Sequence, residues 1–275
     1  MRNPFRTALF VGIGEDAITL VDARKGSRAP AVSQLAWRSR DADAAAQCAA
    51  QLGALFAKAQ VRGGRVHVAF GDALVRYFTV TPPANVADLR DCEAAVAMRF
   101  TALFDDSPER WHLQADWQPT QAFLACALPL ALTEAVETAA RAAGLTVMGL
   151  VPQFVGVWNR WRGKLAPNAW LILAYGSQLT LGVASRQRLH VVKRLPTGAS
   201  IDDAVARLPE LLMREALSLD QAMPDQVSIA APLAGEWGPA GTERLRVQRV
   251  DVPSAVEVPA ALLGGLALAQ SGRAA

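Results

Sequence analysis

The stretch LILAYGSQLTLGVASRQRLHVVKRLPTGAS (residues 171–200) decides the fold, because it repeats the pattern that opens the chain. It predicts an apolar strand that ends at a glycine, an alternating strand, a third strand and the start of a helix. LFVGIGEDAITLVDA (residues 9–23) has the same strand, glycine turn and strand, and a third strand at 31–37 precedes an Ala-rich helix at 41–60. This strand–strand–strand–helix–strand unit occurs twice. The sequence therefore predicts an α/β protein with two related lobes and a ligand cleft between them.

The segment GKLAPNA (residues 163–169) is the best domain boundary in the chain. We expect a first lobe at 1–165 and a second at 166–275. A small αβ insert is expected at about 65–128, and it would begin with two strands paired across the turn Gly71-Asp72. The other expected elements are a helix at 86–104, strands at 111–118 and 122–128, helices at 130–143, 153–164 and about 200–219, and a last helix at 258–270.

Composition and charge exclude several classes of protein. Of the 275 residues, 52% are hydrophobic and 19% charged, which is typical of a folded globular chain. The 28 Lys and Arg nearly balance the 25 Asp and Glu, and the sequence has no dense basic run of the kind that would indicate nucleic-acid binding. No run of about 20 apolar residues predicts a membrane span, and the N-terminus does not have the pattern of a signal peptide. We expect a cytoplasmic location with no nucleic-acid partner.

Scattered reactive residues do not form a recognisable catalytic or metal motif. The three cysteines lack CxxC spacing and are expected to be buried free thiols, and the three histidines lack metal-ligand spacing. They are Cys48, Cys92, Cys126, His67, His112 and His190. No GxSxG motif is present, so Ser177 is interpreted as a turn serine.

Paired acids and clustered tryptophans also favour structural roles. The acid pairs Asp105-Asp106 and Asp202-Asp203 are expected in a turn and in the first turn of a helix. Trp158, Trp161 and Trp170 flank the boundary between the lobes, where core packing is expected and a partner groove is the alternative. Trp111 and Trp117 lie six residues apart, so they share a face if their strand is unbroken.

Five stretches together resemble one superfamily, in the expected order and over most of the chain. They are LFVGIGEDAITLVDA, VRYFTVTPPANVADLRDCEAAVAMRF, LACALPLALTEAVETAARAAGLTVMGLVPQFVGVW, LILAYGSQLTLGVASRQRLHVVKRLPTGAS and LGGLALA. They resemble the actin-like ATPase superfamily and, within it, type IV pilus assembly proteins of the PilM group and the cytoplasmic half of the type II secretion protein GspL. The resemblance implies an actin-like, ribonuclease H-like duplicated fold with a small αβ insert in the first lobe. GspL-like proteins continue into a membrane helix, and this chain ends without one, which favours the PilM-like interpretation.

The resemblance also shows what the two phosphate turns lack. Active members of the superfamily carry the pattern Asp-x-Gly in each turn. In the first turn it falls on Gly12 and Gly14, and in the second, Asp-x-Gly-x-x-x-Thr, it falls on Ala174, Gly176 and Thr180. Both acids are missing. Gly14, Gly176 and Thr180 remain as the candidate remnant of a nucleotide-binding site.

Physical chemistry agrees with a loss of ATP hydrolysis. Without the two carboxylates Mg²⁺ has few hard oxygen ligands, and phosphoryl transfer depends on metal charge and positioning. Glu15 and Asp16 in the first turn repel phosphates unless they point outward. Only Gly235 stands where a Gly-Gly segment usually packs on adenosine. We expect no enzyme activity, cofactor or metal, and binding of ATP and Mg²⁺ without turnover is the open alternative.

The resemblance implies a scaffold of a type IV pilus or type II secretion machine. PilM-like proteins bind the short N-terminal cytoplasmic tail of a PilN-type inner-membrane protein, so this chain would reach the membrane only through its partners. The tail would lie in a groove between the insert and the first lobe, which would involve residues 77–83 and the helix at 86–104. The side chains expected to contact the tail are Tyr77, Phe78, Val80, Val96 and Phe100.

Two other functions stay open at this point. One is a divergent ATPase or small-molecule kinase of the same superfamily, in which other acids such as Asp22 or Glu236 take over the metal. The other is a competence or fimbrial scaffold unrelated to PilN.

Overall fold

The computed structural model describes residues 8–23, 31–86, 88–198, 201–231, 245–251 and 268–269. The chain divides into two compact units, Met1–Arg160 with Ser254–Ala275, and Trp161–Pro253. This division differs from the predicted lobes of 1–165 and 166–275, because the last segment of the chain belongs to the first unit. The candidate Gly235 and most of the expected last helix lie outside the described residues.

The first unit is built on a five-stranded sheet with the order β3-β2-β1-β4-β8. Strands β1 (Ala8–Ile13), β2 (Ala17–Asp22) and β3 (Ala31–Ala36) form an antiparallel meander. Strands β4 (Gly64–Phe70) and β8 (Leu145–Pro152) continue the sheet parallel to β1. The expected pairing of residues 65–70 with 73–80 across Gly71-Asp72 is therefore wrong, since β4 ends at Phe70 and pairs with β1 and β8.

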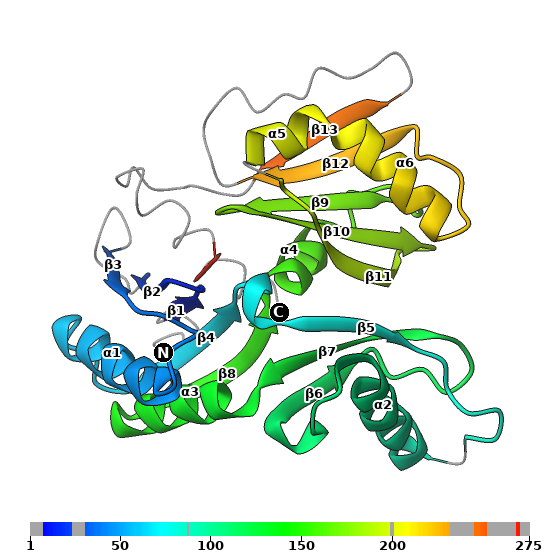
Figure 1. Ribbon diagram of the computed structural model, residues 1–275. Helices are drawn as coiled ribbons and strands as arrows, with labels where there is room; N and C mark the ends of the chain where they lie inside the picture. Colours follow the sequence, from blue (N-terminus) through cyan, green and yellow to red (C-terminus); the bar gives the residue numbers. More distant parts are fainter. Residues whose placement is uncertain are drawn as a thin grey trace, which may run out of the picture. The chain divides into compact units, whose positions relative to one another are not determined.

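Helices α1 (Ala44–Lys58) and α3 (Leu130–Ala142) form the core of this unit with the sheet (Figure 1). The α1 residues Ala44, Cys48, Leu52 and Leu55 are buried at intervals of three or four, which is the spacing of one helix face. They pack on alternate β1 residues such as Leu9. Helix α4 (Gln153–Trp161) follows β8 directly.

The insert is a separate small layer with its own core. Strands β5 (Arg76–Val80), β7 (Phe123–Pro129) and β6 (Trp111–Ala115) form an antiparallel sheet in that order. Helix α2 (Leu89–Phe104) packs on it (Figure 1). The insert thus starts later than the predicted residue 65.

Caps at both ends set the length of α2. Asp88 is its N-cap, and its carboxylate accepts the backbone N–H of Arg90 and Asp91. Asp91 accepts the N–H of Asp88 in return, so the two acids form a capping box. Asp105 ends the helix in a left-handed conformation with φ 49°. The helix therefore begins three residues after the predicted start at 86.

The second unit repeats the topology of the first. Its sheet has the order β11-β10-β9-β12-β13. Strands β9 (Trp170–Tyr175), β10 (Gln178–Ser185) and β11 (Arg188–Leu195) are antiparallel, and β12 (Gln226–Ala231) and β13 (Arg246–Asp251) lie parallel to β9. Helices α5 (Ile201–Ala206) and α6 (Leu208–Ser218) take the place of the single expected helix. The predicted duplication is confirmed strand by strand.

Several smaller predictions are confirmed. All three cysteines are buried free thiols, and burial raises the pKa of Cys48 to about 12. Trp158 and Trp170 are buried as expected, whereas Trp161 is only half-buried. Trp111 and Trp117 both pack against the insert core, although β6 ends at Ala115, before Trp117. Among the described residues, no helix combines the length and apolarity that a bilayer crossing requires.

Candidate functional site

The first glycine turn is closed by its own hairpin and by the residues that follow β3. The Gly14 N–H donates to the carbonyl of Ala17 at 2.8 Å. The carbonyls of the turn are bound in return: Trp37 donates its indole N–H to Gly14 O at 3.0 Å and its backbone N–H to Asp16 O at 2.9 Å. The Ser39 N–H donates to Glu15 O at 3.0 Å. The Gly14 amide, which would face a phosphate in an active turn, is thus used inside the protein.

The acids of this turn point outward. Asp16 is exposed, and Glu15 forms an ion pair with the exposed side chain of Arg40. An exposed ion pair contributes little stability, about 0–1 kcal/mol.

Gly12, the position of the missing first acid, is covered by the end of the chain. It lies in β1 opposite Thr19 of β2 and Ala69 of β4. A Cβ on Gly12 would lie 2.7 Å from the backbone nitrogen of Ala269 and 2.9 Å from Cγ of Leu268. Contacts shorter than 3.0 Å are essentially absent around real Cβ atoms. The close approach of Leu268 and Ala269 therefore depends on the absence of a side chain at position 12.

The second turn is a tight two-residue hairpin. Gly176 adopts φ 56° and, with Ser177, connects the paired residues Tyr175 and Gln178. A positive φ at the first of two turn residues favours glycine, which explains Gly176 without a ligand.

The other positions of the second motif lie inside the second unit. Ala174 belongs to its core, together with Ile172 and Leu179. Thr180 is 2% exposed and pairs with Leu173. A carboxylate at position 174 would enter an apolar core rather than a polar site.

Asp72 forms a buried junction that sequence reasoning missed. It is 4% exposed, and its Oδ1 accepts the Tyr77 hydroxyl at 2.6 Å and the Phe154 N–H at 3.0 Å. Burial, followed by the charge and hydrogen bond of Asp72, holds the pKa of Tyr77 well above its usual value. Burial, followed by Asp72, raises the pKa of Cys126 to about 12. One carboxylate oxygen thus ties β5 of the insert to the start of α4.

Gln153 begins α4 and is 1% exposed, and its Oε1 has no hydrogen-bond partner in the described part of the chain. An unpaired buried carbonyl costs about 1–3 kcal/mol. Asp72 and Gln153 are polar residues that each interrupt or end an apolar run of the sequence. This pattern was only a weak signal for a buried polar junction.

Four of the five side chains predicted to contact a tail pack inside the insert. Phe78, Val80, Val96 and Phe100 are at most 5% exposed and form its core. Tyr77 is bound to Asp72. These residues shape the insert, and a tail would reach them only through the residues that cover them.

An open groove lies on the surface of the insert, between the residues after β5 and helix α2. It has a volume of about 520 Å³. Its lining residues are Thr81, Pro83, Asn85, Asp91, Ala94, Ala95, Met98 and Arg99. The Met98 side chain is 74% exposed in this surface. Apart from Asn85, the lining residues fall in the predicted segments 77–83 and 86–104, but none of them is a side chain that was predicted to contact a tail.

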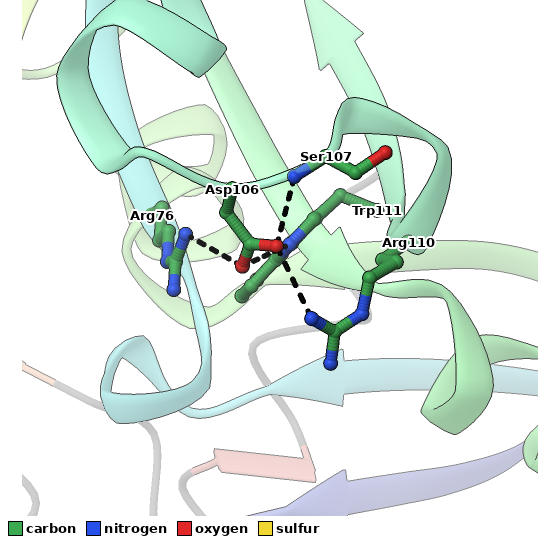
Figure 2. Close-up of polar contacts among 5 residues, drawn as sticks. All are labelled: Arg76, Asp106, Ser107, Arg110 and Trp111. Carbon is green, nitrogen blue, oxygen red and sulfur yellow. Dashed lines mark hydrogen bonds and ion pairs between the residues drawn. The ribbon is translucent and has the colours of Figure 1, made fainter.

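The far end of α2 is held by a cluster around Asp106 (Figure 2). Its carboxylate accepts the Trp111 indole N–H at 3.1 Å and the Ser107 N–H at 2.9 Å. Arg76 and Arg110 pair with it, each at 3.3 Å. The Trp111 hydrogen bond is the main cause of the lowered pKa of Asp106, with Arg110, Ser107 and Arg76 adding to it.

Arg76 also lies over aromatic rings of the insert. Its guanidinium carbon is 4.1 Å from the Trp111 ring centroid and 4.9 Å from that of Phe104. Cation–π contacts of this kind favour a rigid arrangement. The predicted structural role of Asp105 and Asp106 is confirmed, since one ends α2 and the other joins β5, α2 and β6.

The fold is the actin-like ATPase fold, duplicated and carrying an insert. No protein-family model and no curated protein matches the sequence. Among solved structures, the cytoplasmic domain of EpsL, an inner-membrane component of the type II secretion system of Vibrio cholerae, is 12% identical. The match covers 97% of this chain and 94% of that one, with a TM-score of 0.59.

A chain of a PilM–PilN type IV pilus biogenesis complex is 18% identical, with 97% of each chain covered and a TM-score of 0.58. A Bacteroides thetaiotaomicron protein with an actin-like ATPase fold and unknown function is 8% identical, with 89% of this chain and 91% of that chain covered and a TM-score of 0.55. The resemblance to GspL-like and PilM-like proteins is confirmed at the level of the fold.

Proposed function

We propose that this protein is a non-catalytic cytoplasmic scaffold of a type IV pilus or type II secretion machine. In this role it binds the cytoplasmic tail of a PilN-like inner-membrane assembly protein and is held at the membrane by that partner. The likeness to EpsL and to the PilM–PilN complex supports the proposal.

One observation carries the non-catalytic part of the proposal: the Gly14 amide of the first turn is bound within the protein, and the position of the metal-binding acid is closed by other residues. The Gly14 N–H is bound to Ala17, and the position of the metal-binding acid, Gly12, is filled by Leu268 and Ala269. Phosphoryl transfer needs a metal ion and oriented donors at the phosphates. In the first turn no acid stands at position 12, Glu15 is paired with Arg40, and the Gly14 N–H is already bound.

The insert groove is the surface that supports the scaffold role. An extended chain binds well in a groove that offers apolar contact together with a few polar groups that fix its orientation. Met98, Ala94 and Ala95 provide the apolar contact, and Asp91 and Arg99 provide the charges.

A binding assay tests the proposal. The probe is a fluorescein-labelled synthetic peptide of the N-terminal cytoplasmic tail of the membrane protein encoded beside this chain. Micromolar binding in fluorescence anisotropy supports the scaffold role, and no binding at high micromolar protein contradicts it. A phosphate-release assay with Mg-ATP and with sugar and acyl substrates tests the kinase alternative, which predicts turnover.

A further inference from the structure

The groove between residues 81–85 and α2 carries one charge of each sign, with apolar surface between them. Asp91 lies near the N-terminus of α2, and Arg99 lies eight residues later. Ala94, Ala95 and Met98 line the groove between the two charged residues. Arg99 and Met98 are exposed, so this surface is open to solvent.

The spacing of the two charges matches an extended chain. Eight residues of α-helix span about 12 Å at 1.5 Å per residue. Four residues of extended chain span about 13 Å, and residues two apart point to the same side. An extended segment along α2 can therefore place residue i on Asp91, residue i+4 on Arg99 and residue i+2 over Ala95.

We propose that the groove recognises an extended segment of a partner chain with a basic residue, an apolar residue and an acidic residue at positions i, i+2 and i+4. The same pattern read in reverse fits the opposite chain direction. The basic side chain pairs with Asp91, the apolar one packs on Ala94, Ala95 and Met98, and the acidic one pairs with Arg99. This inference rests on the proposed function, because it states which chemistry of the tail the scaffold selects.

Asp91 can serve a partner while it caps the helix. Its Oδ2 accepts the Asp88 N–H at 3.4 Å, and an ionised carboxylate has two oxygens with room for about four hydrogen bonds. The Arg99 guanidinium, in turn, is suited to bidentate recognition of a carboxylate. Charge pairs that are partly desolvated in a groove contribute more than pairs on open surface.

The test uses the labelled tail peptide with charge-reversed protein. Arg99→Asp leaves the capping box intact and is expected to weaken binding about tenfold, and Asp91→Arg is expected to weaken it similarly. Arg90→Asp and Glu93→Arg are the matched controls. They make the same charge changes on exposed residues of α2 that do not line the groove, and they are expected to change affinity less than twofold. Thermal melts followed by circular dichroism report whether each variant is folded.

An exchange of charges makes the test specific. The double variant Asp91→Arg/Arg99→Asp should bind the native peptide weakly and should regain affinity for a peptide whose basic and acidic residues are exchanged. If Arg99→Asp and Arg90→Asp weaken binding equally, or if a binding tail lacks the pattern, this inference is overturned while the scaffold role stands. If the wild-type protein does not bind the tail, both fail.

A second copy of the chain is the competing occupant. Asp91 and Arg99 each lie four residues from Ala95, so an antiparallel α2 from a second copy would also pair them. Exchanging both charges preserves such self-association but removes binding of the native tail. Sedimentation that shows a dimer in the wild type and in the double variant, but not in Arg99→Asp, would overturn the inference in favour of self-association.

Discussion

Restoring the missing acid at Gly12 is expected to destabilise the protein rather than to restore a metal site. The Cβ of Gly12→Asp would lie 2.7 Å from Ala269 N and 2.9 Å from Leu268 Cγ. The closer contact is with backbone, so a change of side-chain rotamer cannot relieve it. Either β1 or the segment that contains Leu268 and Ala269 must move.

Two contributions set the expected loss of stability for Gly12→Ala, and Gly12→Asp adds a third. Overpacking by one carbon costs about 1–3 kcal/mol. The lower chain entropy of alanine than of glycine in the unfolded state returns about 0.4–1 kcal/mol. Gly12→Ala should therefore lower the free energy of unfolding by about 1–2 kcal/mol. Asp adds a buried polar group without a hydrogen-bond partner, which costs about 1–3 kcal/mol more. Gly12→Asp should lose about 2–5 kcal/mol in total.

The assay is urea denaturation at pH 7 followed by circular dichroism, with Gly53→Ala as the matched control. Gly53 lies on an exposed part of α1, and a Cβ there meets nothing within 4 Å. Alanine is a better helix former than glycine by about 1 kcal/mol, so the control should gain stability.

A second variant locates the strain. Leu268→Ala is itself destabilising because Leu268 is 1% exposed, so it serves as the reference for the double variant. In this background Gly12→Asp should cost less stability than in the wild type but still cost some, because the contact with Ala269 N remains. If Gly12→Asp is as stable as the wild type, the chain end moves away readily. Position 12 would then have room for a side chain, contrary to the contacts of Leu268 and Ala269.

Three further predictions concern other parts of the protein. Tyr77→Phe should lower the free energy of unfolding by about 1–3 kcal/mol in urea denaturation, because it removes a donor from a buried carboxylate. In a Tyr175→Phe background, ultraviolet absorbance should show that Tyr77 stays neutral at pH 10. Its raised pKa contributes stability that is present below about pH 10 and lost at higher pH; ionisation of Tyr77 in the folded protein at pH 10 would contradict this. Asp106→Asn should be less stable than the wild type at pH 7, and the difference should shrink in thermal melts below about pH 4. The lowered pKa of Asp106 stabilises the fold only while its carboxylate is ionised. A stability difference that does not depend on pH would argue against a role for the negative charge of Asp106. Arg186 and Gln187 in the β10–β11 turn both adopt positive φ, 51° and 62°. Arg186→Asn/Gln187→Gly should therefore raise the free energy of unfolding by about 1 kcal/mol. An unchanged urea midpoint would show that this turn carries no strain.

The repeated strand order was predictable because each strand shows its own apolar pattern and each turn its own glycine. Gly14 and Gly176 directly follow the first strands of the two units, as expected. The antiparallel meander of each unit depends on short local connections. Local sequence carries this information, since hairpin pairing depends on nearby residues.

Long-range pairing was not predictable in the same way. Gly71-Asp72 has the sequence of a hairpin turn, but Asp72 is held by Phe154, which lies 82 residues later in the chain. No local pattern distinguishes a turn acid from one that bonds to a distant helix. The return of Leu268 and Ala269 to Gly12 was missed for the same reason.

The candidate site shows a further limit of sequence patterns. Phe78, Val80, Val96 and Phe100 alternate or repeat as an apolar face should, and this pattern is the same whether the face meets a partner or the protein's own core. In the structure these residues form the insert core, while the exposed Met98, which lines the groove, was not among the predicted site residues.

We propose that this duplicated fold is a docking platform whose two glycine turns close its own hairpins. Isothermal titration of the purified protein with Mg-ATP tests it most directly. We expect no measurable heat of binding up to millimolar nucleotide, because the Gly14 amide is already bonded and no acid stands at positions 12 and 174. Saturable binding of Mg-ATP with micromolar affinity would contradict it.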